Sequence, residues 1–195
     1  MANRLLAIGA SMAAAGLFTR FLLQKSEEET ARALNASEPD KAVTYKVVKT
    51  WADVGEILMG FVEKYHGDIA AYDNFTFKQW YDHVRLLPYI PDQSKAGQYD
   101  LDVFCRPNRT LAANPLCRDC DDKAILMACY CFRHSISFRF VACSYKKENE
   151  PEHCILEVQL DGEWCECDST YPEDSFPSWR KYYNKITLSE WLDGR

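Results

Sequence analysis

The first amphipathic segment of the chain predicts a helix over residues 50–65. Its apolar residues keep the period of about 3.6 residues that places them on one helical face. They are Trp51, Val54, Ile57, Leu58, Phe61, Val62 and Tyr65. Thr50, with Asp53 three residues later, forms a start that resembles a capping box, and Gly67 suits the end of the helix.

A second helix is predicted from about Thr76 to Leu87, where Pro88 prevents its continuation. The residues that follow, 88–116, contain proline and glycine at intervals. Such punctuation is typical of turns, so this stretch is predicted to be rich in loops.

The second half of the chain combines one buried helix with a run of strands. Residues 121–134 are apolar nearly all round after an acidic first turn, which predicts a helix that is buried on most faces. Residues 137–144 predict a strand. The runs 153–160 and 163–170 follow, joined by Asp161-Gly162. An Asp-Gly pair between two such runs predicts a β-hairpin.

A two-residue turn at 161–162 fixes the pairing of the hairpin strands. It sets Leu160 against Glu163 and Ile155 against Asp168, and side chains then alternate between two faces. One face carries Cys154, Leu156, Val158, Leu160, Cys165 and Cys167, which suit a core. The other face carries His153, Ile155, Glu157, Trp164, Glu166 and Asp168. His153 and Asp168 are diagonal neighbours in this register, so the carboxylate is within reach to orient the imidazole.

Residues 5–23 are apolar apart from small polar residues and Arg20. At about 1.5 Å per residue, a helix of this length spans roughly 28 Å, close to the ~30 Å hydrocarbon core of a bilayer. Small residues recur at helical spacing, as in Gly9 and Ala13, which allows close helix–helix contact in lipid. We therefore predict a membrane-anchor helix at 1–24, with homo-oligomer contacts through it.

A cleaved secretory signal is the alternative for this segment, with Arg4 as its basic start and Ala13–Ala15 near the cleavage region. Residues 25–44 are charged and poor in large apolar residues, which predicts a solvated linker. The globular domain is predicted to cover 45–195. Basic residues on both sides of the apolar segment leave its orientation in the membrane open.

Composition narrows the possible functions. At 195 residues and 47% hydrophobic content, the chain is long enough for one compact domain with a real core plus an appendage. The formal net charge is −6, and the Lys and Arg residues are scattered among acidic ones. This balance argues against a nucleic-acid partner.

All nine cysteines lie between residues 105 and 167. The odd number leaves at least one thiol free, and most of them stand among apolar residues. That pattern suits a reducing compartment, where a buried cysteine acts as a small hydrophobe, although disulfides stay open as an alternative.

A metal or redox role for these cysteines is the other alternative. A four-sulfur zinc site needs two converging pairs, but Cys165 and Cys167 fall on the core face of the hairpin and Cys129–Cys131 point apart on a helix. A redox C-x-x-C at Cys117–Cys120 would need a thioredoxin-like βαβ context, which the pattern lacks. We therefore predict no metal and no cofactor.

Cys120 directly precedes the buried helix and so stands at a helix N-terminus. The macrodipole and free N–H groups there favour a thiolate, which is the nucleophilic form of cysteine. With His153 to take the proton and Asp168 to fix the imidazole tautomer, these residues form the thiol version of a catalytic triad. Backbone N–H groups at the helix start are candidates to stabilise an oxyanion. Side-chain candidates for that role are Gln98, Tyr99 and Asn108.

Three acidic residues flank this nucleophile, at Asp119, Asp121 and Asp122. Negative charge beside a thiol raises its pKa. We therefore expect these side chains to point away from the sulfur or to pair with Arg118 or Lys123.

Four short strings carry a family resemblance. They are RDCDDKAIL at 118–126, HCILEV at 153–158, DGEW at 161–164 and DSTY at 168–171. The first resembles the G-D-C-D-D-K-A nucleophile motif of the transglutaminase-like superfamily of papain-type thiol enzymes, and most of all its bacterial and phage members. The other three resemble the H-x-x-x-E-V, D-G-x-W and D-x-T-Y pattern of the same family. The similarity covers about residues 99–172, with its elements in the order of the family.

The resemblance implies an α+β fold of the papain and transglutaminase type, in which a nucleophile-bearing helix packs on an antiparallel sheet that bears His and Asp. It also implies an amidase or protease that attacks peptide or isopeptide bonds through Cys120, His153 and Asp168. The acyl group would pass to water or to an amine. The chain departs from the family at Arg118, where the family has Gly, and at Ile155, where an aromatic residue is frequent.

The partners expected on this basis are a peptide or protein substrate, peptidoglycan peptides included, and a membrane contacted through residues 5–23. A single N-terminal span would make the protein membrane-associated, and the likeness to phage sequences fits a component of a phage particle. The alternative function is a non-catalytic structural protein of a virion membrane that keeps the transglutaminase-like fold.

Overall fold

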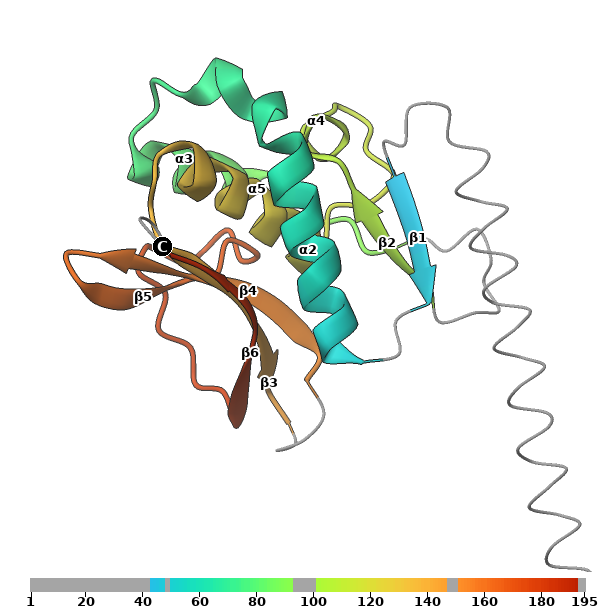
Figure 1. Cartoon of the computed structure of the whole chain (residues 1–195), viewed down its shortest axis with the longest axis vertical. Helices are drawn as coiled ribbons and strands as arrows, with labels where there is room; N and C mark the ends of the chain where they lie inside the picture. The colour runs from blue at the N-terminus through green and yellow to red at the C-terminus, as the bar shows by residue number, and fades with distance from the viewer. Residues whose placement is uncertain (1–42, 48–49, 93–100, 147–150, 193–195) are drawn as a thin grey trace, which may run out of the picture.

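Helices cover one face of an antiparallel sheet in this protein (Figure 1). The computed structural model describes residues 43–47, 50–92, 101–146 and 151–192. The predicted mixture of helices and an antiparallel sheet is confirmed. The helix predicted at 5–23 lies outside the described residues. None of the described helices combines the length and apolarity that crossing a bilayer requires.

The first predicted helix is α2 (Trp51–Tyr65), and its capping box is confirmed. Thr50 Oγ1 accepts from the Asp53 backbone N–H at 3.2 Å, and the Asp53 carboxylate accepts from the Thr50 N–H at 2.8 Å. The α-helix ends at Tyr65 as predicted, with His66 as its C-cap and Gly67 directly after. The chain continues as the 3-10 helix η1 (His66–Tyr72), whose tighter i→i+3 bonds prolong the helical path.

Gly55 lets α2 lie directly against β6 (Asn184–Trp191). A Cβ atom at Gly55 would stand 2.5 Å from the Leu188 carbonyl oxygen, closer than real atoms approach. Gly60 in the same helix faces open space. The absence of a side chain at Gly55 therefore sets the helix-to-sheet distance at this point.

The second predicted helix is α3 (Phe77–Leu86), which begins at a second capping box and ends before Pro88 as expected. The stretch predicted to be rich in loops also contains β2 (Leu101–Cys105) and the short α4 (Pro107–Thr110). β2 pairs antiparallel with β1 (Val43–Val47) as a separate two-stranded sheet. β1 begins two residues before the domain start that the sequence predicts.

The buried helix of the second half is α5 (Cys120–Arg133). Every residue from Asp122 to Cys131 is buried, as the apolar pattern predicts. The helix lies between α2, α3 and the strand β4 (His153–Leu160) (Figure 1). Enclosure by three elements explains why its sequence has no polar stripe.

The main sheet has the strand order β5-β4-β3-β6, where β3 is Phe138–Ser144 and β5 is Glu163–Cys167. The predicted hairpin is confirmed: Leu160 pairs with Glu163 across the turn. Both turn residues have positive φ, 52° at Asp161 and 86° at Gly162. Such angles are typical of the two-residue turns that match strand twist.

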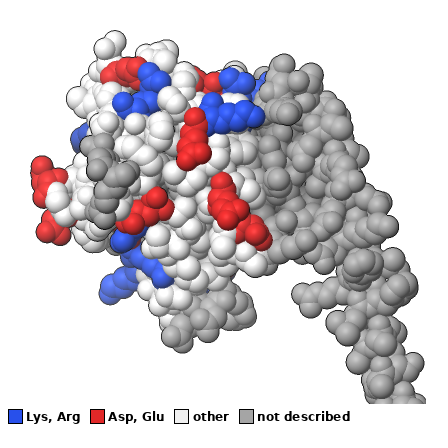
Figure 2. Space-filling model, viewed as in Figure 1, with Lys and Arg blue, Asp and Glu red and all other residues white. Residues whose placement is uncertain are grey.

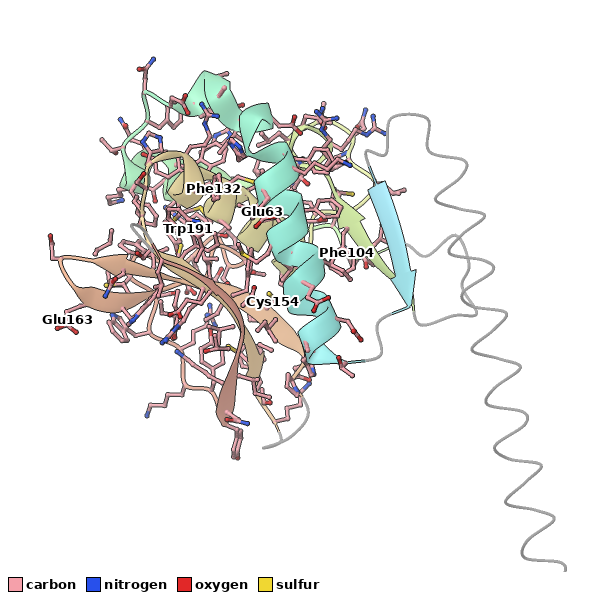
Figure 3. The ribbon with its side chains drawn as sticks, in the orientation of Figure 1. Glu63, Phe104, Phe132, Cys154, Glu163 and Trp191 are labelled. Atoms are coloured by element: carbon pink, nitrogen blue, oxygen red, sulfur yellow. The ribbon has the colours of Figure 1, made fainter. Side chains whose placement is uncertain are left out.

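The two faces of the hairpin have the predicted contents. The helix-facing side joins the core, whereas Ile155 on the other side packs with Val141, Cys143 and Tyr182. β6, which the sequence did not predict, supplies Trp191, whose ring lies 5.2 Å from that of Phe132 on α5 (Figure 3). This contact closes the core at the far end of the sheet from Cys120.

The charged side chains of the face seen in Figure 2 form small separate groups among uncharged residues. Acidic and basic groups both occur there. No extended basic surface is visible on this face, in keeping with the charge balance of the sequence.

Candidate active site

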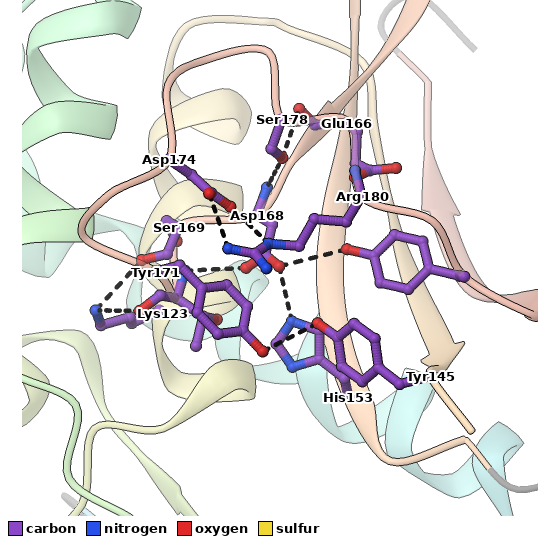
Figure 4. Close-up of polar contacts among 12 residues, drawn as sticks. Lys123, Tyr145, His153, Glu166, Asp168, Ser169, Tyr171, Asp174, Ser178 and Arg180 are labelled. Carbon is purple, nitrogen blue, oxygen red and sulfur yellow. Dashed lines mark hydrogen bonds and ion pairs between the residues drawn. The ribbon is translucent and has the colours of Figure 1, made fainter.

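His153 and Asp168 are in direct contact. His153 is the first residue of β4, and Asp168 directly follows β5. Nε2 of His153 lies 2.9 Å from Oδ2 of Asp168, and the side chains are 6% and 0% exposed (Figure 4). The hairpin register predicted this proximity. A carboxylate accepts only, so Nε2 carries the proton and Nδ1 of the neutral ring is left as the acceptor.

Asp168 is held by contacts on all its polar atoms. Oδ1 accepts from the Thr170 N–H at 2.9 Å, and the Asp168 N–H donates to Ser178 Oγ at 3.0 Å. The Tyr81 hydroxyl donates to the Asp168 carbonyl oxygen at 2.9 Å. Burial by itself would raise the pKa of Asp168, but the hydrogen bonds from His153 and Thr170 outweigh it and hold the pKa below its usual value. The carboxylate therefore stays ionised.

Cys120 is the first residue of α5 and is partly exposed. Its sulfur is within hydrogen-bonding reach of two backbone N–H groups, those of Cys154 and Asp121, which favour the thiolate. Burial and the nearby Asp119 and Asp168 carboxylates act in the opposite direction and raise the pKa of the thiol.

Two cavities meet at the candidate triad, and both are lined by Cys120 and His153 together with Tyr89 and Glu152. The larger, of about 450 Å³, is completed by Tyr145, Thr170, Tyr171 and Pro172. The smaller, of about 220 Å³, is completed by Trp51, Val54, Phe104, Asp119, Asp121 and Cys154. Cys120 therefore lies between a larger cavity lined by tyrosines and a smaller cavity lined by Asp119 and Asp121.

Two of the three acids beside Cys120 do not point away from the sulfur as expected. Asp119 and Asp121 line the smaller cavity, and their carboxylate oxygens lie within 4.8 Å of the Cys120 sulfur and of each other. Burial and the neighbouring Asp119 raise the pKa of Asp121 well above its usual value. Asp122 alone turns away, and its Oδ1 accepts from the Cys105 N–H at 2.8 Å.

The expected pairing of these acids with Arg118 or Lys123 is also wrong, because both cations donate to carbonyl oxygens. Lys123 is buried, and its Nζ lies 2.8 Å from the Leu87 oxygen. The same Nζ lies 3.2 Å from the Ser169 oxygen (Figure 4). Burial, with Arg118 nearby, lowers the pKa of Lys123 to about 8. Lys123 thereby ties the helix of Cys120 to the segment that carries Asp168. The signal for this role was a lysine placed directly before the apolar run of α5.

Arg118 stands where the motif that this string resembles has Gly, yet the backbone at Arg118 does not have positive φ. Among the described residues other than glycine, positive φ occurs at Ser135 and Asp161. The buried Arg118 guanidinium donates to the carbonyl oxygens of Thr110 at 2.7 Å and Ala112 at 2.8 Å. It therefore braces the loop that precedes the nucleophile.

Two tyrosines beside His153 were missed by sequence reasoning. The rings of Tyr145 and Tyr171 lie 5.4 Å and 5.9 Å from the imidazole, and their hydroxyls are 3.1 Å apart. The Arg180 guanidinium lies over the Tyr171 ring at 3.6 Å. Tyr171 belongs to the DSTY string, which could have indicated a place near the site. No motif in the sequence marks Tyr145.

The side-chain candidates for an oxyanion donor gain no support. Gln98 and Tyr99 lie outside the described residues. Asn108 is exposed on α4 and lines neither cavity. Backbone N–H groups near the sulfur are the donors that the described residues offer.

Taken together, a thiol and an imidazole line a two-sided cleft, and a buried carboxylate contacts the imidazole from behind. This arrangement is suited to acyl transfer. Comparison of the chain with protein-family models, with curated proteins and with solved structures gives no match.

Proposed function

We propose that this protein is a transglutaminase-like cysteine amidase or protease that acts on peptide or isopeptide bonds through Cys120, His153 and Asp168. The observation that carries the proposal is the 2.9 Å contact between His153 and Asp168, together with the cavity that His153 and Cys120 both line. The resemblance of the strings around these residues to the transglutaminase-like superfamily supports the same assignment, as does the packing of α5 on β4.

The reaction begins with transfer of the Cys120 proton to Nδ1 of His153. The resulting imidazolium is stabilised by the ionised Asp168, which offsets the raised pKa of the thiol. The thiolate attacks the substrate carbonyl carbon, and the C–N bond breaks as His153 returns the proton to the leaving amine. The acyl group, now a thioester on Cys120, passes to water or to a second amine.

Backbone N–H groups supply the electrostatic support for these steps. The N–H of Cys154 and the N–H of Asp121 face the sulfur and favour its negative charge. The first N–H groups of a helix have no intrahelical partner, so those at the start of α5 are further candidates to stabilise an oxyanion. No side-chain oxyanion donor is required by this scheme.

The larger cavity suits the substrate. A volume of about 450 Å³ with Tyr89, Tyr145 and Tyr171 on its walls offers apolar and aromatic surface beside the sulfur. We infer that a peptide segment with an apolar side chain lies here. Peptidoglycan peptides and protein chains both remain candidate substrates.

Trapping of the acyl-enzyme tests the proposed function. The full chain is incubated with a library of short peptide amides, quenched in acid, and its intact mass is measured. We expect an acyl adduct that maps to Cys120 and is absent in Cys120→Ala. Cys165→Ala is the matched control, because Cys165 is the other cysteine that is partly exposed. Adducts that survive in Cys120→Ala would exclude the proposed nucleophile.

A membrane tether remains part of the proposal, on the strength of the apolar segment 5–23 alone. We propose that it fixes the domain 45–195 to a bilayer and that a phage particle is one setting for it. Sedimentation of the full chain with membranes after carbonate washing is expected, and loss of sedimentation in a chain that starts at residue 25. A full chain that stays in the supernatant would count against the tether.

A second candidate function is a non-catalytic structural protein with the same fold, for instance in a virion membrane. The observation that favours it is the Asp119 carboxylate within 4.8 Å of the Cys120 sulfur, which together with burial raises the pKa of the thiol. Under this hypothesis the full chain forms no acyl adduct with any peptide, and Cys120→Ala leaves its assembly unchanged. An adduct on Cys120 distinguishes the two functions directly.

A further inference from the structure

Three buried side chains converge on the side of α5 that faces β2, away from the candidate triad. They are Cys105 at the end of β2, Cys117 before α5, and Asp122 in the first turn of α5, all fully buried. Their sulfur and carboxylate oxygen atoms all lie within 4.8 Å of one another. None of the cysteine pairs weighed from the sequence corresponds to this set.

The Asp122 carboxylate is the unusual member of the group. Oδ1 accepts from the Cys105 N–H at 2.8 Å, whereas Oδ2 is buried and has no hydrogen-bond partner. A buried oxygen without a partner is costly to a fold and calls for an explanation. Fixing one carboxylate oxygen on a backbone donor leaves the other oriented for a ligand, as in second-shell support of metal sites.

The donor set has a clear chemical preference. Two thiolate sulfurs and one carboxylate oxygen match the ligands that zinc takes in proteins. Sulfurs bound to one zinc ion at about 2.3 Å stand about 3.8 Å apart in a tetrahedron, within the 4.8 Å separation seen here. A further oxygen is close by, since the Val103 carbonyl lies 3.4 Å from the Cys117 sulfur.

The charges also balance. A zinc ion with two thiolates and one carboxylate carries one net negative charge. The buried Arg118 guanidinium interacts electrostatically with Asp122 and supplies the compensating positive charge. Arg118 occupies the position of the motif's Gly, so this compensation is a feature of the present chain.

We propose that Cys105, Cys117 and Asp122 form a structural zinc site that fastens the first turn of α5 to β2 and to the preceding loop. Because the site is closed to solvent, the ion enters as the chain folds. Fixing the first turn of α5 fixes Cys120, two residues before the Asp122 ligand. The site is separate from the cavities of the proposed enzyme and does not depend on that function.

Metal analysis of the full chain tests the proposal. Protein produced in zinc-supplemented medium and freed of loosely bound metal should retain about one zinc ion per chain. X-ray absorption at the zinc edge should show two sulfur ligands at about 2.3 Å, with lighter atoms completing the shell. The Cys105→Ser/Cys117→Ser chain should lose the ion, while the control Cys129→Ser/Cys131→Ser, which changes two other buried cysteines, should keep it.

Several results would overturn the site. A full chain that retains no zinc, or that retains copper in its place, excludes it. So does a zinc shell with more than two sulfurs, or a Cys105–Cys117 disulfide found by peptide mapping of the purified protein. The absorption spectrum of the unmutated chain decides the matter even if the double variant fails to fold.

Discussion

The Lys123 ammonium group lies 3.2 Å from the carbonyl oxygen of Ser169, deep between α5 and the segment that follows β5. Lys123 is three residues after the candidate nucleophile, and Ser169 directly follows the residue that orients His153. The buried Lys123 therefore fixes the helix that carries Cys120 relative to the segment that carries Asp168. Neither Lys123 nor Ser169 lines the proposed substrate cavity. Their contact therefore positions the candidate site and does not bind substrate.

Replacing Lys123 with Met should therefore destabilise the fold. The change leaves the carbonyl oxygens of Leu87 and Ser169 without their charged donor inside the protein. We expect the free energy of unfolding to fall by about 2–4 kcal/mol in urea titration. Lys78→Met, on the exposed side of α3, is the matched control and should change stability little. Equal stability of the two variants would contradict the positioning role.

The close approach of α2 to β6 gives a second stability prediction. Gly55→Ala places a methyl group against the Leu188 carbonyl and should destabilise the protein by about 1–3 kcal/mol. Gly60→Ala, in the same helix but facing open space, should stabilise it by up to about 1 kcal/mol, because alanine favours the helix. Thermal unfolding of both variants measures the difference. Stabilisation by Gly55→Ala would show that the two elements lie farther apart.

These elements also show what the sequence could and could not predict. The hairpin register placed His153 and Asp168 together because an Asp-Gly turn fixes strand pairing locally. β6 escaped prediction because it is an edge strand with mostly half-exposed or exposed residues, and a bulge at Phe140/Val141 shifts its register. The pairing of β1 with β2 joins segments distant in sequence, which no local pattern reports.

In the candidate site, too, some features follow from the local sequence and others depend on tertiary packing. Cys120 at a helix N-terminus follows from the chain itself, but its position beside His153 depends on how α5 packs on β4. The orientation of Asp119 and Asp121 toward the cleft could not be predicted, because helix periodicity does not specify which neighbours a first turn meets. Lys123 and Arg118 were expected to pair with acids, yet each donates to backbone carbonyl oxygens instead.

Asp168 should make the stability of the fold depend on pH in the acid range. Its pKa in the folded protein lies below the ordinary value of 3.8, so folding favours the ionised form. The stability it contributes is therefore fully present above about pH 4 and is lost as pH falls through the folded pKa. In unfolding titrations, the difference in stability between the unmutated chain and Asp168→Asn should be largest near pH 7 and shrink toward pH 2.

The control for this prediction is Asp161→Asn, which removes the charge of an exposed aspartate in the hairpin turn. Asn tolerates the positive φ of this position as Asp does, so the turn is kept. Its difference from the unmutated chain should stay small across the range. An Asp168→Asn difference that is constant from pH 7 to pH 2 would show that the carboxylate is not stabilised in its ionised form.

The reactivity of Cys120 tests the central claim most directly. Alkylation by iodoacetamide near neutral pH is followed for each cysteine by peptide mass spectrometry, in the unmutated chain and in His153→Ala. If Cys120, His153 and Asp168 act together, Cys120 reacts at least about tenfold faster than Cys165 and loses that advantage in His153→Ala. Alkylation of Cys120 that is no faster than that of Cys165 and indifferent to His153 would contradict the catalytic triad.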